Sequence, residues 1–401
     1  MSMRVLIVTT CLGGGGAERH AVRLANAWGA DDATEVVVGV IRGGGSYREF
    51  LDPHVDYVEL APAWASKRTL FACLSSIRPL RRLIESQRPD VLLSILQPAT
   101  WTGQQACRSL PVHKVPLRIA AVQNHFQHQG IGRRAMWMQH RMAASVAKAD
   151  HIVAISAGVA ESIQQQFPAT EGITSVIHNA AVDVGWEPPI EASDGGEPDS
   201  HLLSSASDAA LRLVACGRLV EQKGFDLLLP AIRRVRERSP VHLTILGEGA
   251  ERAKLEKMRA QLGLDAVVAM PGFVKDPLKT FCENDLFVLS SRWEGFGNVI
   301  VEAMSVGLPV VATDCHFGPS EIITPGVDGW LATKVESDEL ANTILKAIEH
   351  RSKWPEMARN ARRRASDFKA ETIASQYLRL FRELANRRRV ESPQDENTGC
   401  D

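Results

Sequence analysis

The sequence predicts an α/β protein built from two doubly wound, Rossmann-like domains. Its 401 residues, 45% of them hydrophobic, are too many for one typical domain. Short apolar runs alternate with helical patterns, which is typical of βαβ units and a parallel sheet. A segment rich in proline, glycine, serine and acids interrupts this alternation once, at 187–210. We therefore expect a domain at 1–186, an exposed linker at 187–210 and a second domain at 211–365.

The strands are expected where short apolar runs stand between helical patterns, because buried parallel strands are apolar on both faces. In the first domain the runs are Arg4–Val8, Glu35–Val40, Val91–Ile95, Leu117–Val122, His151–Ile155 and Ile173–Ile177. In the second domain they are Leu211–Ala215, His242–Leu246, Ala266–Met270, Leu286–Leu289 and Pro309–Ala312.

A last amphipathic pattern predicts a C-terminal helix from Ser366 to Arg389, which we expect to cross back to the first domain. Its apolar positions are Phe368, Ile373, Tyr377, Leu378, Leu380, Phe381 and Leu384. The polar residues 390–401 show no apolar periodicity and predict a disordered tail.

The charge of the chain is nearly balanced overall but uneven along the sequence. The net charge of −1 argues against a general nucleic-acid binder. The stretch between Trp64 and Lys148 contains thirteen basic residues and only two acidic ones, so it carries a net charge of +11. The stretch is the natural candidate for contact with an anionic surface.

The lengths of the apolar runs and the spacing of the cysteines predict a cytosolic protein. The only apolar run near the amino terminus is too short for a signal peptide, and no later run approaches the ~20 residues that a membrane span needs. The cysteines form no C-x-x-C pair, so neither zinc nor a disulfide framework is indicated. They are Cys11, Cys73, Cys107, Cys216, Cys282, Cys315 and Cys400.

Four glycines, Gly13–Gly16, follow the first predicted strand and precede a helical pattern. They do not fit G-x-G-x-x-G, because Glu18 and Arg19 stand where the third glycine would be needed, and no Gly-Lys-Ser/Thr follows for a P-loop. A glycine loop at a helix N-terminus suits an approaching anion. The alternative is a plain flexible turn.

The segment Ser291–Met304 gives the strongest signal, since Glu294 and Glu302 bracket a glycine-bearing strand-to-helix turn. A helix starting near Asn298 would place Glu302 beside the core, where an unpartnered carboxylate is costly. A capping role does not explain it, because Val301 holds the position that a capping box gives to an acid. Sugar hydroxyls would satisfy both carboxylates; the alternative is a structural Glu302.

Glu294 to Glu302 resembles the E-x7-E motif of the retaining glycosyltransferases of family 4, which have the two-domain GT-B architecture, with both domains facing a cleft. The likeness covers nearly the whole chain. His178–Asp183 departs from that family's usual P-N-G-V-D, with His178 in place of proline. The other matching segments are Gly15–Glu18 (G-G-x-E), Cys216–Gly224 (containing G-R-L-x-x-x-K-G), Gly247–Gly249 (G-x-G), Pro271–Val274 and Gly318–Ile323 (G-P-x-E-I-I).

The resemblance implies a role for each matching residue. Arg218 and Lys223 would bind the donor's pyrophosphate, Glu302 the ribose hydroxyls and Glu294 a hydroxyl of the transferred sugar. The implied catalytic residues are Glu294, His125, Arg218 and Lys223, with His125 contacting the sugar rather than acting as general base. The implied donor-binding residues are Gly15, Gly16, Arg218, Lys223, Gly247, Val274, Glu294, Phe296, Gly297, Asn298, Val299 and Glu302.

The expected reaction is transfer of a hexose or N-acetylhexosamine from a nucleotide sugar, with UDP as the expected nucleotide. No Asp-x-Asp motif appears, so we expect no bound metal and no cofactor. The Gly318–Glu321 loop, which resembles that of members that build bacterial surface glycans, favours an N-acetylhexosamine donor. The expected acceptor is a polyprenyl-diphosphate-linked saccharide at the inner face of the cytoplasmic membrane.

Two basic helical patterns in the first domain suggest how such an acceptor is reached. In Lys67–Gln87 an apolar stripe with arginines at its edges is expected to face the core, and Pro79 to kink or divide it. Arg133–Lys148 is basic as well and carries Trp137 and Met138. Such faces can attract an anionic leaflet; the alternative is a solvated face. The stripe residues are Leu70, Leu74, Ile77, Leu80 and Ile84.

Two other functions stay open at this point. The same chemistry could act on a soluble sugar acceptor, or the chain could be a cationic binding protein on an inactive GT-B fold. The joint presence of Glu294, Glu302, Arg218 and Lys223 argues against the second. A nicotinamide oxidoreductase is least favoured, because the dinucleotide fingerprint is absent.

Overall fold

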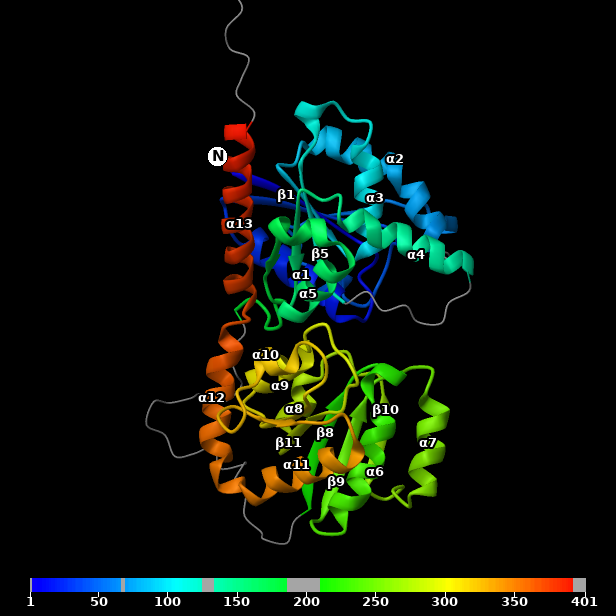
Figure 1. Cartoon of the computed structure of the whole chain (residues 1–401), viewed down its shortest axis with the longest axis vertical. Coiled ribbons are helices and arrows are strands. Elements are labelled where there is room, and N and C mark those ends of the chain that lie inside the picture. Colours follow the sequence, from blue (N-terminus) through cyan, green and yellow to red (C-terminus); the bar gives the residue numbers. More distant parts are fainter. Residues whose placement is uncertain (1, 66–68, 125–132, 186–209, 392–401) are drawn as a thin grey trace, which may run out of the picture. The chain divides into compact units, whose positions relative to one another are not determined.

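The computed structural model describes residues 2–65, 69–124, 133–185 and 210–391 (Figure 1). The chain divides into two compact units. Nearly all of the predicted linker 187–210 and of the predicted tail 390–401 lies outside the described residues. Unit 1 comprises Met1–Ile155, Ser162–Ala180 and Ala370–Asp401, and unit 2 comprises Ser156–Glu161 and Ala181–Lys369.

Unit 1 contains a seven-stranded parallel sheet with the order β3-β2-β1-β4-β5-β6-β7. Six of its strands lie where the apolar runs predicted them. The exception is β3, whose charged and half-buried residues give no apolar run because it is an edge strand. The strands are β1 Met3–Thr9, β2 Thr34–Val40, β3 Asp56–Glu59, β4 Val91–Ile95, β5 Leu117–Val122, β6 His151–Ala154 and β7 Thr174–Val176.

Helices cover both faces of this sheet, as a doubly wound fold requires. Alternate residues of β1 enter two different cores: Val5 and Ile7 pack in the cluster that includes α1 and α13, whereas Leu6 and Val8 pack in the cluster of α2 and α3. The helices of unit 1 are α1 Gly16–Gly29, α2 Thr69–Gln87, α3 Gln97–Cys107, α4 Arg133–Val146, α5 Ala157–Gln166, whose first half, up to Glu161, belongs to unit 2, and α13 Ala370–Glu391.

The final helix packs against α1 in unit 1, which confirms that the chain crosses back. The indole Nε1 of Trp28 donates a hydrogen bond to the carbonyl of Ala374 at 3.2 Å. Tyr377 and Phe381 lie 6.1 and 5.8 Å from the Trp28 ring, and all three side chains are buried. The helix starts at Ala370 rather than at Ser366, because Ser366 ends the preceding helix α12.

The predicted core stripe of α2 is wrong in part. Leu74 is 49% exposed, and the buried face is formed instead by Ala72, Cys73, Ser76, Leu80 and Ile84. Small residues at the start of α2 allow close packing against α3, and the larger Leu74 is left facing outward. The helix also runs through Pro79 without division.

Unit 2 contains a six-stranded parallel sheet with the order β10-β9-β8-β11-β12-β13. Among the described strands of this unit, β13 alone was not predicted; it is a three-residue edge strand, Trp330–Ala332, with no further apolar residues beside it in the sequence. The strands are β8 Leu211–Cys216, β9 Val241–Leu246, β10 Val268–Gly272, β11 Leu286–Leu289, β12 Val310–Thr313 and β13 Trp330–Ala332. The helices are α6 Phe225–Arg236, α7 Arg252–Gln261, α8 Leu278–Cys282, α9 Asn298–Ser305, α10 Pro319–Ile322, α11 Ser337–Glu349 and α12 Trp354–Ser366.

In each sheet the strand order reverses once, and this point determines where a ligand can bind. The reversal lies between β1 and β4 in unit 1 and between β8 and β11 in unit 2. Ligands of open α/β sheets bind beyond the carboxyl ends of the strands at such a point. The glycine loop Gly13–Gly16 follows β1, and the segments of the predicted donor site follow β8 and β11.

His20 on α1 joins the glycine loop's helix to the segment after β7. Its Nδ1 accepts a hydrogen bond from the backbone N–H of Ala180 at 2.9 Å, so the ring is neutral, and its Nε2 has no partner among the described residues. Burial, together with the nearby Arg23, lowers the pKa of His20 to about 3.

Acid should therefore destabilise the protein through His20. Below pH 6.5 the histidine is protonated in the unfolded state, whereas in the folded state it stays neutral until about pH 3. The free energy of unfolding therefore falls as the pH falls through this window. Between pH 7 and 5 the loss from this residue is about 2 kcal/mol. Urea titrations of the wild type and His20→Asn at several pH values measure it.

The exposed His242 provides the control. His242→Asn should keep the wild-type slope of stability against pH, whereas His20→Asn should flatten it. Parallel pH profiles for the wild type and His20→Asn would contradict a neutral, buried His20.

Candidate functional site

The loop after β8 depends on glycines for its shape. Gly224 has a φ of 61°, and a Cβ there would lie 2.0 Å from the carbonyl oxygen of Ser290. Glycine is therefore required both by conformation and by space. At Gly217 a Cβ would lie 3.2 Å from the aliphatic chain of Lys223, so this glycine gives the lysine room to lie along the loop.

Hydrogen bonds hold the loop after β8 against the loop after β11. The hydroxyl of Ser290 donates to the carbonyl of Lys223 at 2.8 Å, and the N–H of Arg292 donates to the carbonyl of Gln222 at 2.8 Å. The Gln222 side chain donates in turn to the carbonyl of Trp293 at 3.0 Å. Since β8 and β11 are neighbours, these bonds fix the two loops as one structure.

An ion pair lies at the centre of this structure. Lys223 Nζ is 2.5 Å from Glu294 Oε1, and the two side chains are only 13% and 7% exposed. The hydroxyl of Ser291 donates to the same Oε1 at 2.6 Å. The sequence predicted Lys223 and Glu294 as site residues but not their contact, and it gave no role to Ser291.

The ion pair leaves hydrogen-bonding capacity for a ligand. An ammonium has three donors, and Lys223 uses one of them on Glu294. The side-chain hydrogen bonds of Glu294 with described residues both reach Oε1, so Oε2 remains as an acceptor. One end of the pair can therefore take an anion while the other takes a hydroxyl.

The neighbouring thiol of Cys315 stays uncharged. Burial and, to a smaller extent, the Glu294 carboxylate raise its pKa to about 12, although Lys223 opposes the rise. The charged groups beside it are therefore the lysine and the glutamate.

Glu302 lies in the second turn of α9 and is 5% exposed, as predicted for a helix that begins at Asn298. Gly297 precedes the helix with a φ of 105°. The positive end of the α9 dipole lies here, where it favours an anion. Gly318 shapes the same turn, because a Cβ on it would lie 2.1 Å from the carbonyl oxygen of Phe296.

The loops after β9 and β10 continue this edge of the sheet. The N–H of Gly247 donates to the carbonyl of Gly272 at 2.8 Å, and a Cβ on Gly247 would lie 1.9 Å from the carbonyl oxygen of Gly217. Val274, two residues beyond β10, is half-buried. Arg218 is exposed, and its side chain makes no ion pair or hydrogen bond with the described residues.

In unit 1 the glycine loop meets a second glycine segment that the sequence did not single out. Gly45 has a φ of 120°, and a Cβ there would lie 2.0 Å from the carbonyl oxygen of Leu12. Gly15 precedes α1 with an ordinary extended backbone. None of Gly13–Gly16 has a positive φ, so these glycines supply open backbone rather than an unusual turn.

The predicted sugar contact, His125, lies outside the described residues. The residue two positions before it, Gln123, accepts a hydrogen bond from the buried Asn179 at 2.9 Å. Asn179 belongs to the segment that departs from the usual P-N-G-V-D. Its side chain is therefore bonded to the first residue after β5.

Glu321, in the segment that resembles G-P-x-E-I-I, binds the start of α5. Its carboxylate accepts hydrogen bonds from the N–H groups of Ala157 and Gly158 at 2.9 and 3.4 Å. From α12, Arg364 donates to the carbonyls of Glu321 and Ile322. The carboxylate thus has a structural task within unit 2.

Two family comparisons match most of the chain between them. Residues 14–183 match the family described as Glycosyltransferase Family 4. Residues 206–364 match the family described as Glycosyl transferases group 1.

Individual proteins extend this similarity. LpsE of Rhizobium meliloti, a lipopolysaccharide core biosynthesis glycosyltransferase, is 26% identical over 92% of this chain and 96% of its own. A poly(ribitol-phosphate) alpha-N-acetylglucosaminyltransferase of Staphylococcus aureus is 31% identical over 41% of this chain, a match that spans 34% of its own length. The crystal structure of HepE of Anabaena with UDP and glucose has a TM-score of 0.73 and 23% identity, covers 95% of this chain and 99% of its own, and shows the same fold.

Removing one partner of the central ion pair should destabilise the protein. Lys223→Met leaves the Glu294 carboxylate buried without its counter-charge, which costs about 3 to 5 kcal/mol. Adding Glu294→Gln to that variant removes the uncompensated charge and should restore most of the loss. Urea denaturation of both variants measures the difference.

An exposed ion pair of the same unit is the control. Asp338→Asn, which breaks the surface pair with Arg234, should change stability little because water screens it. If Lys223→Met unfolds no more readily than Asp338→Asn, the Lys223–Glu294 pair is not the buried contact described.

Proposed function

The chain belongs to family 4 of the glycosyltransferases, with the GT-B architecture, and we propose that it is a retaining enzyme of surface-glycan synthesis. It transfers a hexose or N-acetylhexosamine from a UDP-linked donor to a lipid-diphosphate-linked saccharide. The relationship with LpsE supports the surface-glycan role, and the UDP complex of HepE supports the donor nucleotide.

The observation that carries this proposal is the buried Lys223–Glu294 pair beside the exposed Arg218. When the glycosidic bond of the donor breaks, negative charge grows on the departing diphosphate and must be stabilised. The spare donors of Lys223 and the guanidinium of Arg218 are suited to that charge. Oε2 of Glu294 accepts a hydroxyl of the sugar, which holds the reacting carbon next to the departing phosphate.

The remaining roles follow the same chemistry. We propose that Glu302 accepts the ribose hydroxyls, that the backbone from Phe296 to Val299 meets the phosphates, and that Gly247 and Val274 border the nucleotide. Gly15 and Gly16 present backbone N–H groups to the diphosphate, and His125 contacts the sugar. The acceptor attacks on the face from which the diphosphate leaves, and an oxygen of that phosphate takes its proton.

Cationic side chains replace a divalent ion in this proposal. The sequence has no Asp-x-Asp motif, and two cations at the diphosphate supply the charge that a metal would otherwise bring. The reaction therefore needs no metal and no cofactor.

The exposed face of α2 supports an acceptor held at a membrane. Phe71 and Leu74 are 50% and 49% exposed, and Trp64, just before the helix, is 75% exposed. Arg78 and Arg82, also exposed, continue the same helical face. Apolar groups beside cations suit the interface of an anionic bilayer. No described helix has the length and apolar character to span a membrane.

Loss of the exposed cation should remove donor binding without harming the fold. UDP should raise the melting temperature of the wild type, because a ligand that binds only the folded state stabilises it. Arg218→Ala and Glu302→Gln should lose this rise. In transfer assays with EDTA present, Arg218→Ala should cost about 2 to 4 kcal/mol of transition-state stabilisation.

The matched control is Arg233→Ala, which removes an exposed arginine of α6. It should keep both the UDP response and the turnover. A wild type with no response to UDP, or activity that returns only when Mg²⁺ replaces EDTA, would contradict the proposed donor chemistry.

Membrane docking should depend on the apolar residues of α2. In flotation assays the protein should bind phosphatidylglycerol vesicles better than phosphatidylcholine vesicles, and salt should weaken the binding. Phe71→Ser with Leu74→Ser should reduce it severalfold, while Val327→Ser, an exposed valine of unit 2, should not. Equal binding to both vesicles without salt dependence, or transfer only to soluble sugars, would favour a soluble acceptor.

A further inference from the structure

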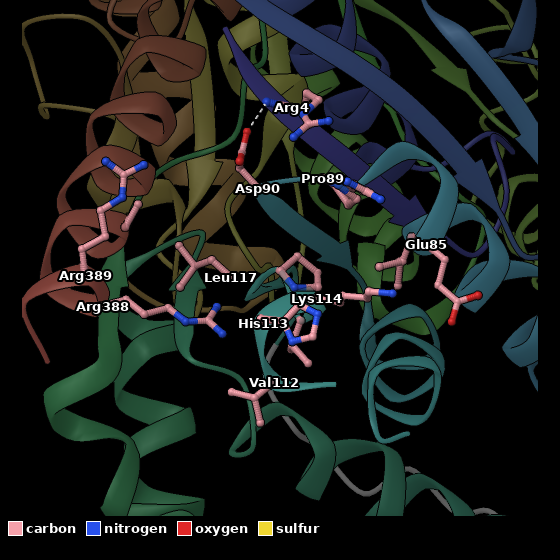
Figure 2. A pocket seen from close by; sticks show the side chains of 15 residues that line it. Arg4, Glu85, Pro89, Asp90, Val112, His113, Lys114, Leu117, Arg388 and Arg389 are labelled. Carbon is pink, nitrogen blue, oxygen red and sulfur yellow. Dashed lines mark hydrogen bonds between the residues drawn. The ribbon is translucent and has the colours of Figure 1, made fainter. Parts of the chain in front are cut away.

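Unit 1 has a hollow at the amino-terminal edge of its sheet, at the opposite end of the strands from the glycine loop (Figure 2). Its volume is about 1210 Å³. Four segments that are distant in the sequence line it: the start of β1 at Arg4, the end of α2 and the turn after it at Ile84–Asp90, the segment Val112–Leu117, and the last turns of α13 at Ala385–Arg389.

The floor of the hollow is apolar and its wall is cationic. Ile84, Pro116 and Leu117 are buried beneath it. Five lysine and arginine side chains line it. Arg4 donates to the carbonyl of Gln87 at 3.2 Å, and the other four make no side-chain hydrogen bond or ion pair with the residues that the structure describes. They are Arg88, Lys114, Arg388 and Arg389. Figure 2 shows Arg388 reaching from α13 toward His113.

The two acids of the lining do not neutralise these cations. Asp90 accepts the backbone N–H of Arg4 at 2.8 Å (Figure 2). Glu85 lies across the hollow from Arg388 and Arg389 in the same view and pairs with no described cation. The hollow therefore has a clear excess of positive charge.

Helix ends explain only part of this arrangement. Cations are favoured at a helix C-terminus, and α2 and α13 both end here. That accounts for Arg88, Arg388 and Arg389 one by one. It accounts little for Lys114, because the 3-10 helix that Lys114 ends, Val112–Lys114, is a single turn with a small dipole. Arg88 also has a φ of 46°, a conformation that favours glycine, so an arginine at this position carries a backbone cost.

We propose that this hollow binds an oligophosphate, a ligand with two or more linked phosphate groups. Guanidinium groups bind phosphate through paired hydrogen bonds, and bringing four cations together is favourable when an anion lies between them. Cations from three segments around so large a hollow exceed what one phosphate can contact. The site is separate from the proposed donor site and does not depend on it.

Calorimetric titration with inorganic pyrophosphate tests this site. The titration uses the full chain carrying Arg218→Ala, which weakens the proposed donor site. Pyrophosphate should bind, and more tightly than inorganic phosphate. Adding Arg388→Ala with Arg389→Ala should weaken binding at least tenfold. Adding Arg379→Ala with Arg382→Ala instead, two exposed arginines of the same helix outside the hollow, should leave it unchanged.

A second arm distinguishes a free oligophosphate from a lipid headgroup. Vesicles of phosphatidylcholine with a polyprenyl diphosphate replace soluble pyrophosphate in flotation. If either probe binds and this binding is lost without Arg388 and Arg389, the site is supported. The probe that binds shows whether the ligand is a free oligophosphate or a lipid headgroup. Equal binding by the hollow variant and the Arg379/Arg382 control, or no binding of either probe, would overturn it. If UDP does not raise the melting temperature of the wild type, which keeps Arg218, that result contradicts the donor site and leaves the oligophosphate site untouched.

Discussion

The contact between Lys223 and Glu294 depends on the order of strands in unit 2, and the proposed chemistry depends on that contact. The two residues belong to loops that follow β8 and β11, strands far apart in the sequence but paired in the sheet. Their opposite charges offset part of the free-energy cost of burying each charge in a place that is almost closed to water. A ligand can place an anionic group on Lys223 and a hydroxyl on Glu294 while the two side chains stay in contact.

Glycines serve two different physical purposes in this chain. In unit 2, Gly224 and Gly318 are required, since each has a positive φ and a Cβ would collide with a carbonyl oxygen. In unit 1, Gly13–Gly16 have no such backbone requirement. The first kind fixes loops against each other, and the second kind keeps backbone accessible. A run of glycines in a sequence does not distinguish the two.

Much of the fold could be predicted because buried parallel strands are apolar on both faces. Edge strands such as β3 are not apolar on both faces, so they give no such signal. A helix such as α2 can bury its small residues and leave Leu74 exposed, which only the packed structure shows. For the candidate site, the sequence predicted residues one by one. The pairing of Lys223 with Glu294 and the basic hollow of unit 1 were not predicted, because each joins segments that only the tertiary fold brings together.

The last helix gives the chain an unusual order of assembly. Trp28 on α1 is covered by Ala374, Tyr377 and Phe381 of α13, so the core between α1 and the sheet stays open on one side until residues 374–381 have been synthesised. A nascent chain on the ribosome can complete unit 2 from its own residues earlier, since domains fold as their segments emerge. During synthesis the amino-terminal part would therefore be the last to become fully native, and a premature stop before residue 370 would leave an exposed tryptophan for chaperones and proteases to recognise.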